Sequence, residues 1–310
     1  MTIIEAVIQG IVQGLTEFLP VSSSGHLNIT QHIMGQTEDN LFFSVMLHIG
    51  TLVAVCAFYY KLIWRLIKAF FSAIRDIFTG KFRWSEMDED RNMLVMLVIG
   101  LLPLFLLFLP IPGTELKVKD IADQLANAKY FIIVGIALMV TSLLLTLGSL
   151  ASRKRSAQGD DAASSGKSRM NVVDAVVVGL TQCCAALFPG LSRSGSTLAA
   201  GQMRGVNKQK ALDYTFVLAI PSILAAAVLE LKDAMESEGG ISVEIAPLLI
   251  GVLVAAVVGY LSIVLFKWLL KTDKMIVFIL YTAIVGAAVV VVSIIEMQTG
   301  MNLFTGAPIV

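Results

Sequence analysis

The feature that most constrains this chain is a series of apolar stretches, each about as long as a bilayer is thick. A helix needs about 20 apolar residues to cross the hydrocarbon core. Six segments meet this length: 41–60, 93–110, 130–150, 212–230, 246–268 and 275–296. Hydrophobic residues make up 56% of the 310 and charged residues 15%, with a mean hydropathy of +0.81, which excludes a soluble globule with a mostly polar surface. The sequence predicts an all-α polytopic membrane protein.

Charge and cysteine usage exclude other classes. The formal net charge is zero, so the chain has no electrostatic footprint for nucleic acid. Cys56, Cys183 and Cys184 have no spacing typical of a disulfide framework or a zinc site, and we interpret them as small hydrophobic residues. A basic stretch with a cleavage site is missing from the start of the sequence, and Glu5 interrupts the apolar run, so we expect mature sequence there.

Two further apolar segments, 1–19 and 172–188, differ from the six spans. Each runs into a Pro/Gly/Ser cluster and resumes as a short helix-like piece, at 24–35 and 195–205. Irregular backbone at membrane depth persists only where protein or water satisfies its polar groups. Each segment is therefore predicted to be a re-entrant hairpin, a helix, a tight turn and a helix that returns to the same side.

The two hairpins are copies of an internal repeat. Aligning them on Pro20 and Pro189 also aligns three preceding features: Glu5-Ala6-Val7 with Asp174-Ala175-Val176, Gly10 with Gly179, and Gln13 with Gln182. Three spans lie between the copies, and an odd number inverts the second relative to the first. We expect one membrane domain made of a first inverted repeat over 1–150, a cytoplasmic linker over 151–171 and a second inverted repeat over 172–300.

Basic residues in the short loops predict the orientation. Seven lie between Lys61 and Arg91 and five between Arg153 and Arg169, so both loops are expected in the cytoplasm. The acidic loop, with Asp233, Glu236, Glu238 and Glu244, is expected outside, and the turn with Lys267, Lys271 and Lys274 inside. Both termini then lie outside, the first hairpin on the outer face and the second on the inner face. Ser152 to Ser168 is predicted to be a flexible linker without chemistry.

Polar residues at the two turns form the candidate site, because ionisable groups at bilayer depth indicate function. Serines 22, 23 and 24 precede a helix start expected at about Gly25, and serines 192, 194 and 196 surround Gly195. Serine caps helix N-termini, and two N-termini aimed at one point form an anion pocket. Arg193 adds a planar fork of donors suited to phosphate.

The acidic part of the site is Glu17, with Gln13 one helical turn earlier on the same face. A carboxylate beside a phosphate pocket suits a bridging divalent cation, since Mg²⁺ uses one or two carboxylates plus phosphate oxygens. His26 is expected to face the same cavity as Ser23 and to act as nucleophile, base or acid. This set is sufficient for hydrolysis of a phosphorylated lipid.

Simpler roles stay open for these residues. The serines could be helix caps alone, Glu17 an interfacial residue and His26 a structural hydrogen-bonding partner. For His48, on a plain span, contact between helices and a place in the cavity are equally compatible with the sequence. Asp213, near a span end, is expected to be solvated.

Two long motifs carry a resemblance to a known family. Gln13 to Glu17 runs into Phe-Leu-Pro-Val-Ser-Ser-Ser-Gly-His, and Pro-Gly-Leu-Ser-Arg-Ser-Gly-Ser-Thr spans Pro189 to Thr197. The chain resembles the undecaprenyl-diphosphate phosphatases of the bacitracin-resistance type over nearly all of 1–300. The resemblance implies hydrolysis of undecaprenyl diphosphate to undecaprenyl phosphate and phosphate in the bacterial cytoplasmic membrane, which recycles the carrier for cell-wall synthesis and confers bacitracin resistance.

The resemblance also implies residue roles and cofactors. Catalysis would fall to Glu17, with Ser23 and His26 as nucleophile or base candidates and Arg193 as the phosphate clamp. The phosphate would be bound by Ser22, Ser24, Gly25, Ser192, Ser194, Gly195 and Thr197. The family depends on a divalent cation, Mg²⁺ or Ca²⁺, here at Glu17 and Gln13. Gln13 stands where other members carry a second glutamate, so Glu17 would be the only carboxylate that binds the cation.

The resemblance also implies partners, and the pocket leaves alternative functions open. The expected partners are the polyprenyl diphosphate and the bilayer, with bacitracin acting only indirectly by competing for the substrate; a homodimer is compatible with the sequence. The alternative function is a polyprenyl-phosphate transporter or flippase that uses the same midplane pocket. A structural lipid-binding subunit would not need His26 and Glu17 together. Phosphate release separates these classes, because a pure flippase releases none.

Overall fold

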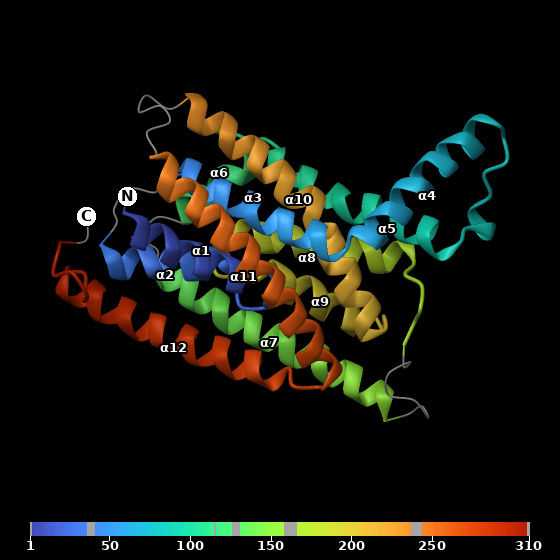
Figure 1. The fold of residues 1–310 in the computed structure, drawn as a ribbon. Helices are drawn as coiled ribbons and strands as arrows, with labels where there is room; N and C mark the ends of the chain where they lie inside the picture. Colours follow the sequence, from blue (N-terminus) through green and yellow to red (C-terminus); the bar gives the residue numbers. More distant parts are fainter. Residues whose placement is uncertain are drawn as a thin grey trace.

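The computed structural model describes residues 2–35, 41–114, 116–125, 131–157, 166–236 and 244–308. Within these ranges the chain is all-α, as predicted, and isolated β-bridges are its only extended pairings. Figure 1 shows the helices side by side in one bundle, with both chain termini at the same end. The helices are α1 Ile3–Phe18, α2 Ser23–Met34, α3 Leu41–Phe58, α4 Tyr60–Phe78, α5 Glu89–Leu101, α6 Val118–Leu125, α7 Phe131–Ser156, α8 Val172–Leu187, α9 Arg193–Met203, α10 Lys208–Glu236, α11 Ile245–Lys271 and α12 Ile276–Thr299, with 3₁₀ segments η1 Trp84–Glu86 and η2 Leu102–Phe108.

Five of these helical segments are long and apolar enough to cross a membrane, and a bent pair of helices would make a sixth. The five are Glu89–Phe108, Phe131–Ser156, Lys208–Leu229, Ile245–Lys271 and Ile276–Thr299. They coincide with five of the apolar stretches recognised in the sequence. The chain is a multi-pass membrane protein.

The segment 93–110 is not one regular helix. It is α-helical up to Leu101 and continues as η2, in which Pro103 occupies one of the first positions. Proline has no backbone N–H and its ring clashes with the carbonyl four residues earlier, so the α-helical ladder does not continue through it. The tighter 3₁₀ turn carries the chain forward from there.

The basic segment after the first span, expected to be a loop, contains the 19-residue helix α4. It is bent by 82° from the preceding helix. Tyr59, at the bend, donates a hydrogen bond to Asp213 Oδ1 over 2.8 Å, and Lys267 Nζ donates to the same oxygen over 3.0 Å. Asp213 is therefore not simply solvated, because it holds the bend against α10 and α11.

Equivalent glycines allow equivalent helices to pack closely. A Cβ on Gly10 of α1 would lie 2.7 Å from the Gly251 carbonyl of α11, and one on Gly179 of α8 would lie 2.4 Å from the Gly100 carbonyl of α5. Any larger side chain would force these backbones apart. The repeat alignment of Gly10 with Gly179 thus reflects two matching helix contacts.

The first helix of each copy begins in the same way. The side chain of Thr2 accepts from the Glu5 backbone and that of Asn171 from the Asp174 backbone, and each acid bonds back to its cap residue. These reciprocal capping boxes satisfy two free N–H groups at each start. They explain why Glu5 and Asp174 occupy matching positions.

The described residues at both ends of the predicted linker have defined structure. Helix α7 continues to Ser156, and Lys167 is tied down by backbone hydrogen bonds to Gly205 and Asn207 and by its ammonium group on the buried carboxylate of Asp174. These contacts hold the end of the segment that was expected to be flexible. Residues 158–165 lie outside the described residues, as does Glu238 of the acidic loop, while the Asp233 and Glu236 side chains are also not described.

Candidate active site

The two polar turns have the same capping geometry. Ser22 is the N-cap of α2 and accepts from Gly25 N over 3.2 Å; Ser192 is the N-cap of α9 and accepts from Gly195 N over 3.1 Å. In each turn the cap hydroxyl lies 3.3 Å from the hydroxyl two residues later. Both helices therefore begin two residues before the predicted glycines, and both N-termini present free N–H groups at the turn.

The tips of the two turns lie directly against each other. A Cβ on Gly25 would be 2.9 Å from the Gly190 Cα, and one on Gly195 would be 3.1 Å from Pro20 Cβ. Ser194 Oγ also donates to the Leu19 carbonyl over 3.0 Å. The glycines thus bring the start of α2 and the start of α9 to one place.

One of the turns is strained. Ser22 has φ +76°, a region that residues with a side chain rarely adopt, whereas Gly190 takes φ +94° in the other turn. Such a conformation costs of order 1–3 kcal/mol and persists only where surrounding contacts hold it. At Ser22 the cap bond and the packing of the tips provide those contacts.

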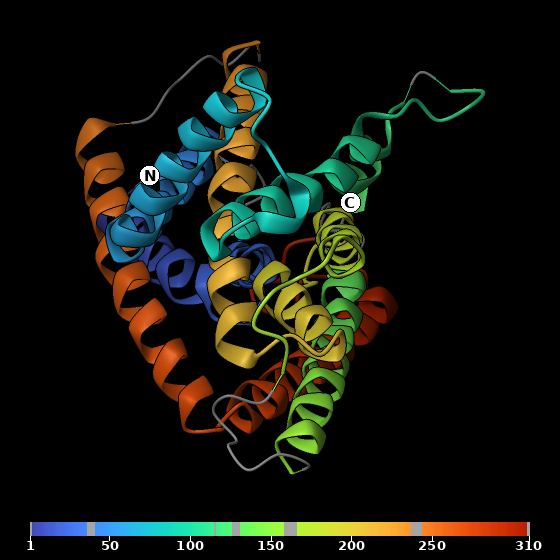
Figure 2. The same ribbon diagram turned by 90° about the vertical axis from the view of Figure 1, so that its right-hand side faces the viewer.

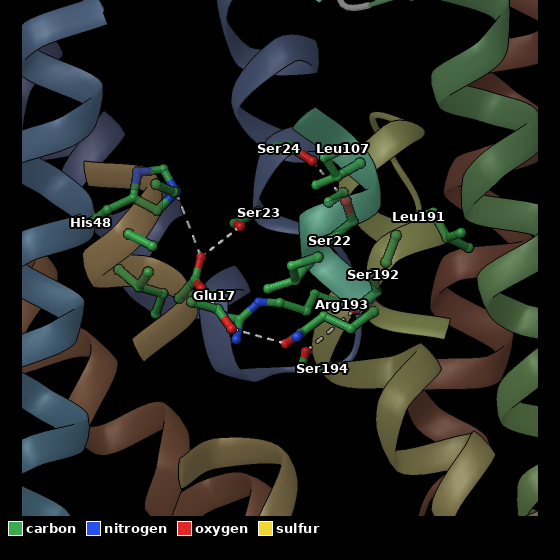
Figure 3. Close-up of a pocket in the computed structure, with 18 of the residues that line it drawn as sticks. Glu17, Ser22, Ser23, Ser24, His48, Leu107, Leu191, Ser192, Arg193 and Ser194 are labelled. Atoms are coloured by element: carbon green, nitrogen blue, oxygen red, sulfur yellow. Dashed lines mark hydrogen bonds and ion pairs between the residues drawn. The ribbon is translucent and has the colours of Figure 1, made fainter. Parts of the chain in front are cut away.

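Glu17, at the end of α1, is the centre of the polar cluster. Its Oε1 forms an ion pair with Arg193, and its Oε2 accepts from Ser23 Oγ over 2.7 Å and from Gln13 Nε2 over 3.1 Å. His48 Nε2 from α3 lies 3.8 Å from the same Oε2. Figure 3 shows Ser23 and His48 on one side of the carboxylate and Arg193 on the other. A buried carboxylate is thus flanked by a cation, a hydroxyl and an imidazole.

This cluster lines one wall of a cavity of about 310 Å³. The polar lining comes from Thr16, Glu17, Ser22, Ser23, Ser24, His48, Gln182, Ser192, Arg193, Ser194 and Ser222. Most of the rest is apolar and belongs mainly to η2, α8 and α10, including Leu104, Phe108, Ala185 and Leu229. A cavity with a small set of convergent polar groups and an otherwise apolar wall is typical of a small-ligand site, here for an amphiphile with an anionic head.

Comparison with known proteins identifies the chain's relatives. A family model described as bacitracin resistance protein BacA matches residues 6–288. The chain belongs to this family. It is 38% identical to an undecaprenyl-diphosphatase of Alkaliphilus metalliredigens over 297 residues, which cover 95% of this chain and 100% of the relative. Undecaprenyl-diphosphatases of Methanobrevibacter smithii and Bacteroides thetaiotaomicron are 38% and 34% identical, each over 99% of the relative's length.

In this BacA-family chain, the cavity brings together most of the predicted site residues. Of those expected to bind phosphate, Ser22, Ser24, Ser192 and Ser194 line it, together with Glu17, Ser23 and Arg193. Gly25 and Gly195 pack the tips instead, and Thr197 is buried with its hydroxyl donating to the Arg193 carbonyl over 2.8 Å. Gln13 lies behind Glu17 and does not line the cavity.

His26 is outside the cavity, contrary to the expectation that it faces the same space as Ser23. Its Nδ1 lies 2.8 Å from the Ser22 carbonyl, four residues earlier, which turns the ring back along the helix. Its Nε2 lies 2.7 Å from the Tyr281 hydroxyl of α12, and the two rings stack. The side chain thus fixes the first turn of α2 against α12.

Sequence reasoning gave no role in the site to Gln182 and Ser222, and left His48 undecided. The Ser222 and Gln182 side chains lie 3.2 Å apart across the cavity wall, from α10 and α8. Gln182 could have been found from the sequence, because it occupies the position of Gln13 in the second copy of the repeat. No sequence pattern indicates His48, because only the packing of α3 against α1 brings it to Glu17.

The chemistry of the donor set bears on the expected cation. Among the described residues there is no group of three or more His, Cys, Asp or Glu side chains that could hold a metal. Glu17 does offer carboxylate oxygens at the cavity, and Gln13 Oε1 beside it is buried without a hydrogen-bond partner. Glu17 fits a cation that takes its other ligands from phosphate and water, whereas Gln13 lies behind that carboxylate and donates to it.

Proposed function

We propose that this chain hydrolyses undecaprenyl diphosphate to undecaprenyl phosphate and inorganic phosphate, and so recycles the lipid carrier for cell-wall synthesis. The observation that carries the proposal is the contact of Glu17 with both Arg193 and Ser23 in a cavity whose other wall is apolar. A diphosphate headgroup matches the polar wall and a prenyl chain the apolar one. Membership of the BacA family supports the same activity.

The architecture that we propose has six transmembrane helices and two re-entrant hairpins in an inverted repeat. The hairpins are α1–α2 and α8–α9. Their matching capping boxes, N-cap serines and helix-packing glycines support two copies of one unit. The copies also exchange contacts, because α1 packs on α11 of the second copy and α8 packs on α5 of the first.

We place the protein in the bacterial cytoplasmic membrane, with its cavity open toward the outer side. Several apolar residues of the cavity come from η2 and from α10 up to Leu229. In the proposed orientation these are the ends of α5 and α10 that are farthest from the basic cytoplasmic segments. The headgroup would therefore enter from the outer leaflet.

Substrate binding would replace the contact between Glu17 and Arg193. The guanidinium group matches phosphate oxygens in a bidentate geometry, and the N-termini of α2 and α9 favour negative charge. The phosphate oxygens would accept hydrogen bonds from Arg193 and from the free N–H groups at the two turns. This arrangement places positive charge where the equatorial oxygens gain charge during phosphoryl transfer.

Ser23 is the nucleophile that we propose. Its oxygen attacks the distal phosphorus, its proton passes to Glu17 Oε2, and the bond between the phosphorus and the bridging oxygen breaks to release undecaprenyl phosphate. Water then hydrolyses the phosphoserine, and the proton returns to Ser23. The hydrogen bond of 2.7 Å between Ser23 and Glu17 supports this order. Direct attack by water oriented on Glu17 is the alternative.

A divalent cation, Mg²⁺ or Ca²⁺, would be held by Glu17, with Gln13 acting behind that carboxylate. It would neutralise charge on the diphosphate. His26 would serve the reaction by positioning, since its contacts with Ser22 and Tyr281 fix the turn that carries Ser23. Bacitracin would act by competing for the diphosphate, and a homodimer is the oligomer that we would test first.

The proposal is tested by phosphate release from undecaprenyl diphosphate by detergent-solubilised protein. We expect turnover by the wild-type chain and loss of at least about a hundredfold for Glu17→Gln, which keeps the shape but removes the proton acceptor. A chain that binds the lipid without releasing phosphate would be a transporter and would overturn the proposal. The matched control is Glu86→Gln, an exposed acid on η1.

A further inference from the structure

Helix α4 carries two stripes that no part of the cavity uses. Figure 1 shows it leaving the bundle at the end of the molecule opposite the chain termini, and Figure 2, which looks at that end, shows it in front of the other helices. Tyr60, Trp64, Phe71 and Phe78 recur at helical spacing and are 60%, 58%, 65% and 87% exposed. They form one face of the helix.

A basic row runs beside this aromatic face. Lys61, Lys68 and Arg75 are seven residues apart and therefore lie in line along the helix. Neither lysine has a carboxylate partner in the described part of the chain; their ammonium groups lie over the Tyr60 and Trp64 rings, 5.8 and 5.5 Å from the centroids. Between residues 60 and 83 the sequence has six basic residues and one acid, Asp76.

An apolar groove lies along the same helix. It has a volume of about 450 Å³, every residue that lines it is apolar, and its walls are α4, α5 and α10. Phe71 belongs both to the groove and to the aromatic face, and that face lies between the groove and the basic row on the surface of α4. A lipid with an anionic head and acyl chains matches both parts.

We infer that α4 is a binding site for anionic phospholipids of the cytoplasmic leaflet, with headgroups along the row formed by Lys61, Lys68 and Arg75 and an acyl chain in the groove. The charge complementarity decides between occupants. A zwitterionic lipid has no net charge and would gain less from a row of cations than an anionic lipid, and a second copy of this chain would place like charges together. Aromatic and basic side chains on one surface helix are typical of the membrane interface. The inference depends on the membrane location of the chain and not on its chemistry.

The test uses Trp64 as a contact probe. The chain has three tryptophans, so Trp84→Phe with Trp268→Phe leaves Trp64 as the only one. The protein is reconstituted in mixed phosphatidylcholine and phosphatidylglycerol vesicles, with brominated chains on one lipid or the other. We expect brominated phosphatidylglycerol to quench Trp64 more strongly at equal mole fraction. Equal quenching by both lipids, or by neither because another chain covers the face, would overturn the inference.

Charge variants locate the site. Lys61→Gln with Lys68→Gln should lower the relative affinity for phosphatidylglycerol about fivefold for each lysine removed, since a basic residue at an anionic surface contributes about 1 kcal/mol. The control, Lys117→Gln with Lys119→Gln, makes the same charge change at the start of α6 and should keep the preference. If the probe background does not fold, native mass spectrometry of the wild-type tryptophan set compares retained phosphatidylglycerol with and without the two lysines. Equal retention would refute the assignment, whatever the phosphatase activity.

Discussion

At the turn between α1 and α2 the N-cap and first helical residue are Ser22 and Ser23, whereas between α8 and α9 they are Ser192 and Arg193. The cap bonds match to within 0.1 Å, at 3.2 and 3.1 Å. The side chains at the first helical position differ in chemistry, yet both reach Glu17. A symmetric backbone thus holds an asymmetric site, with the acid and hydroxyl in one copy and the cation in the other.

This difference gives the two turns different chemical roles. The first supplies groups that can move a proton, and the second supplies the charge that holds phosphate. The N-cap serines, Ser22 and Ser192, hold the two turns in place and take neither of these roles themselves. Substitutions at matching positions should therefore have unequal effects, and the size of the inequality tests the assignment.

The largest effect is expected at Arg193. Arg193→Ala should lower phosphate release from farnesyl or undecaprenyl diphosphate by at least about a thousandfold, the range found for arginines that stabilise phosphoryl transfer. Ser22→Ala should cost far less, because a lost N-cap removes about 1 kcal/mol of stability. Arg83→Ala, an exposed arginine with the same charge change, is the control. Equal activity of the Arg193 and Ser22 variants would defeat the division of roles.

Within the first turn, Ser23 and Ser24 form the next contrast. Ser23 Oγ donates to Glu17, whereas Ser24 Oγ contacts only the Ser22 hydroxyl among the described residues. Ser23→Ala should lower the rate about a hundredfold or more, and Ser24→Ala less than about tenfold. Radiolabel from the terminal phosphate should be trapped on Ser23 in acid-quenched wild-type protein. A fully active Ser23→Ala protein would leave water as the nucleophile.

The contact between the two tips gives a prediction for stability. In Gly25→Ala the new methyl group would meet the Gly190 backbone at 2.9 Å, and in Gly195→Ala it would meet Pro20 Cβ at 3.1 Å. Overpacking of this kind costs roughly 1–3 kcal/mol, and the backbone contact of Gly25 has less room to relax. The unfolding midpoint in detergent should fall for both variants and further for Gly25→Ala. The reverse order would mean that the tips do not pack as described.

The sequence predicts the apolar helices well because their boundaries carry strong local signals. Hydrophobic runs, capping boxes and the Pro/Gly/Ser breaks all act within a few residues, and α1, α2, α8 and α9 lie where these signals put them. Helix α4 was missed for the same reason. Its Lys61, Lys68 and Arg75 make the segment look like a basic loop, although seven-residue spacing places them on one face of a helix.

The site divides in the same way. Glu17 and Arg193 could be paired from sequence, because the repeat and the turn motifs predict that the tips meet. Contacts made only by tertiary packing could not be predicted, such as His48 against Glu17 or Tyr281 against His26. No local pattern tells which face of α3 or α12 turns toward the first hairpin, since both helices are apolar nearly all round.

The two histidines near the first turn give the smallest predicted effect. The His48 Nδ1 lies 2.9 Å from the Ser44 carbonyl, which leaves Nε2 to face Glu17 at 3.8 Å. His48→Ala should lower the rate about fivefold, because it removes a polar contact of about 1 kcal/mol from the carboxylate. His48→Gln should keep most of the activity, since an amide can also donate to Glu17. Tyr281→Phe removes one hydrogen bond from His26 outside the cavity and should lower the rate less than His48→Ala. Steady-state phosphate release ranks the three variants. A larger loss in Tyr281→Phe than in His48→Ala would contradict the prediction and would mean that His26, which contacts α12, matters more to the reaction than His48.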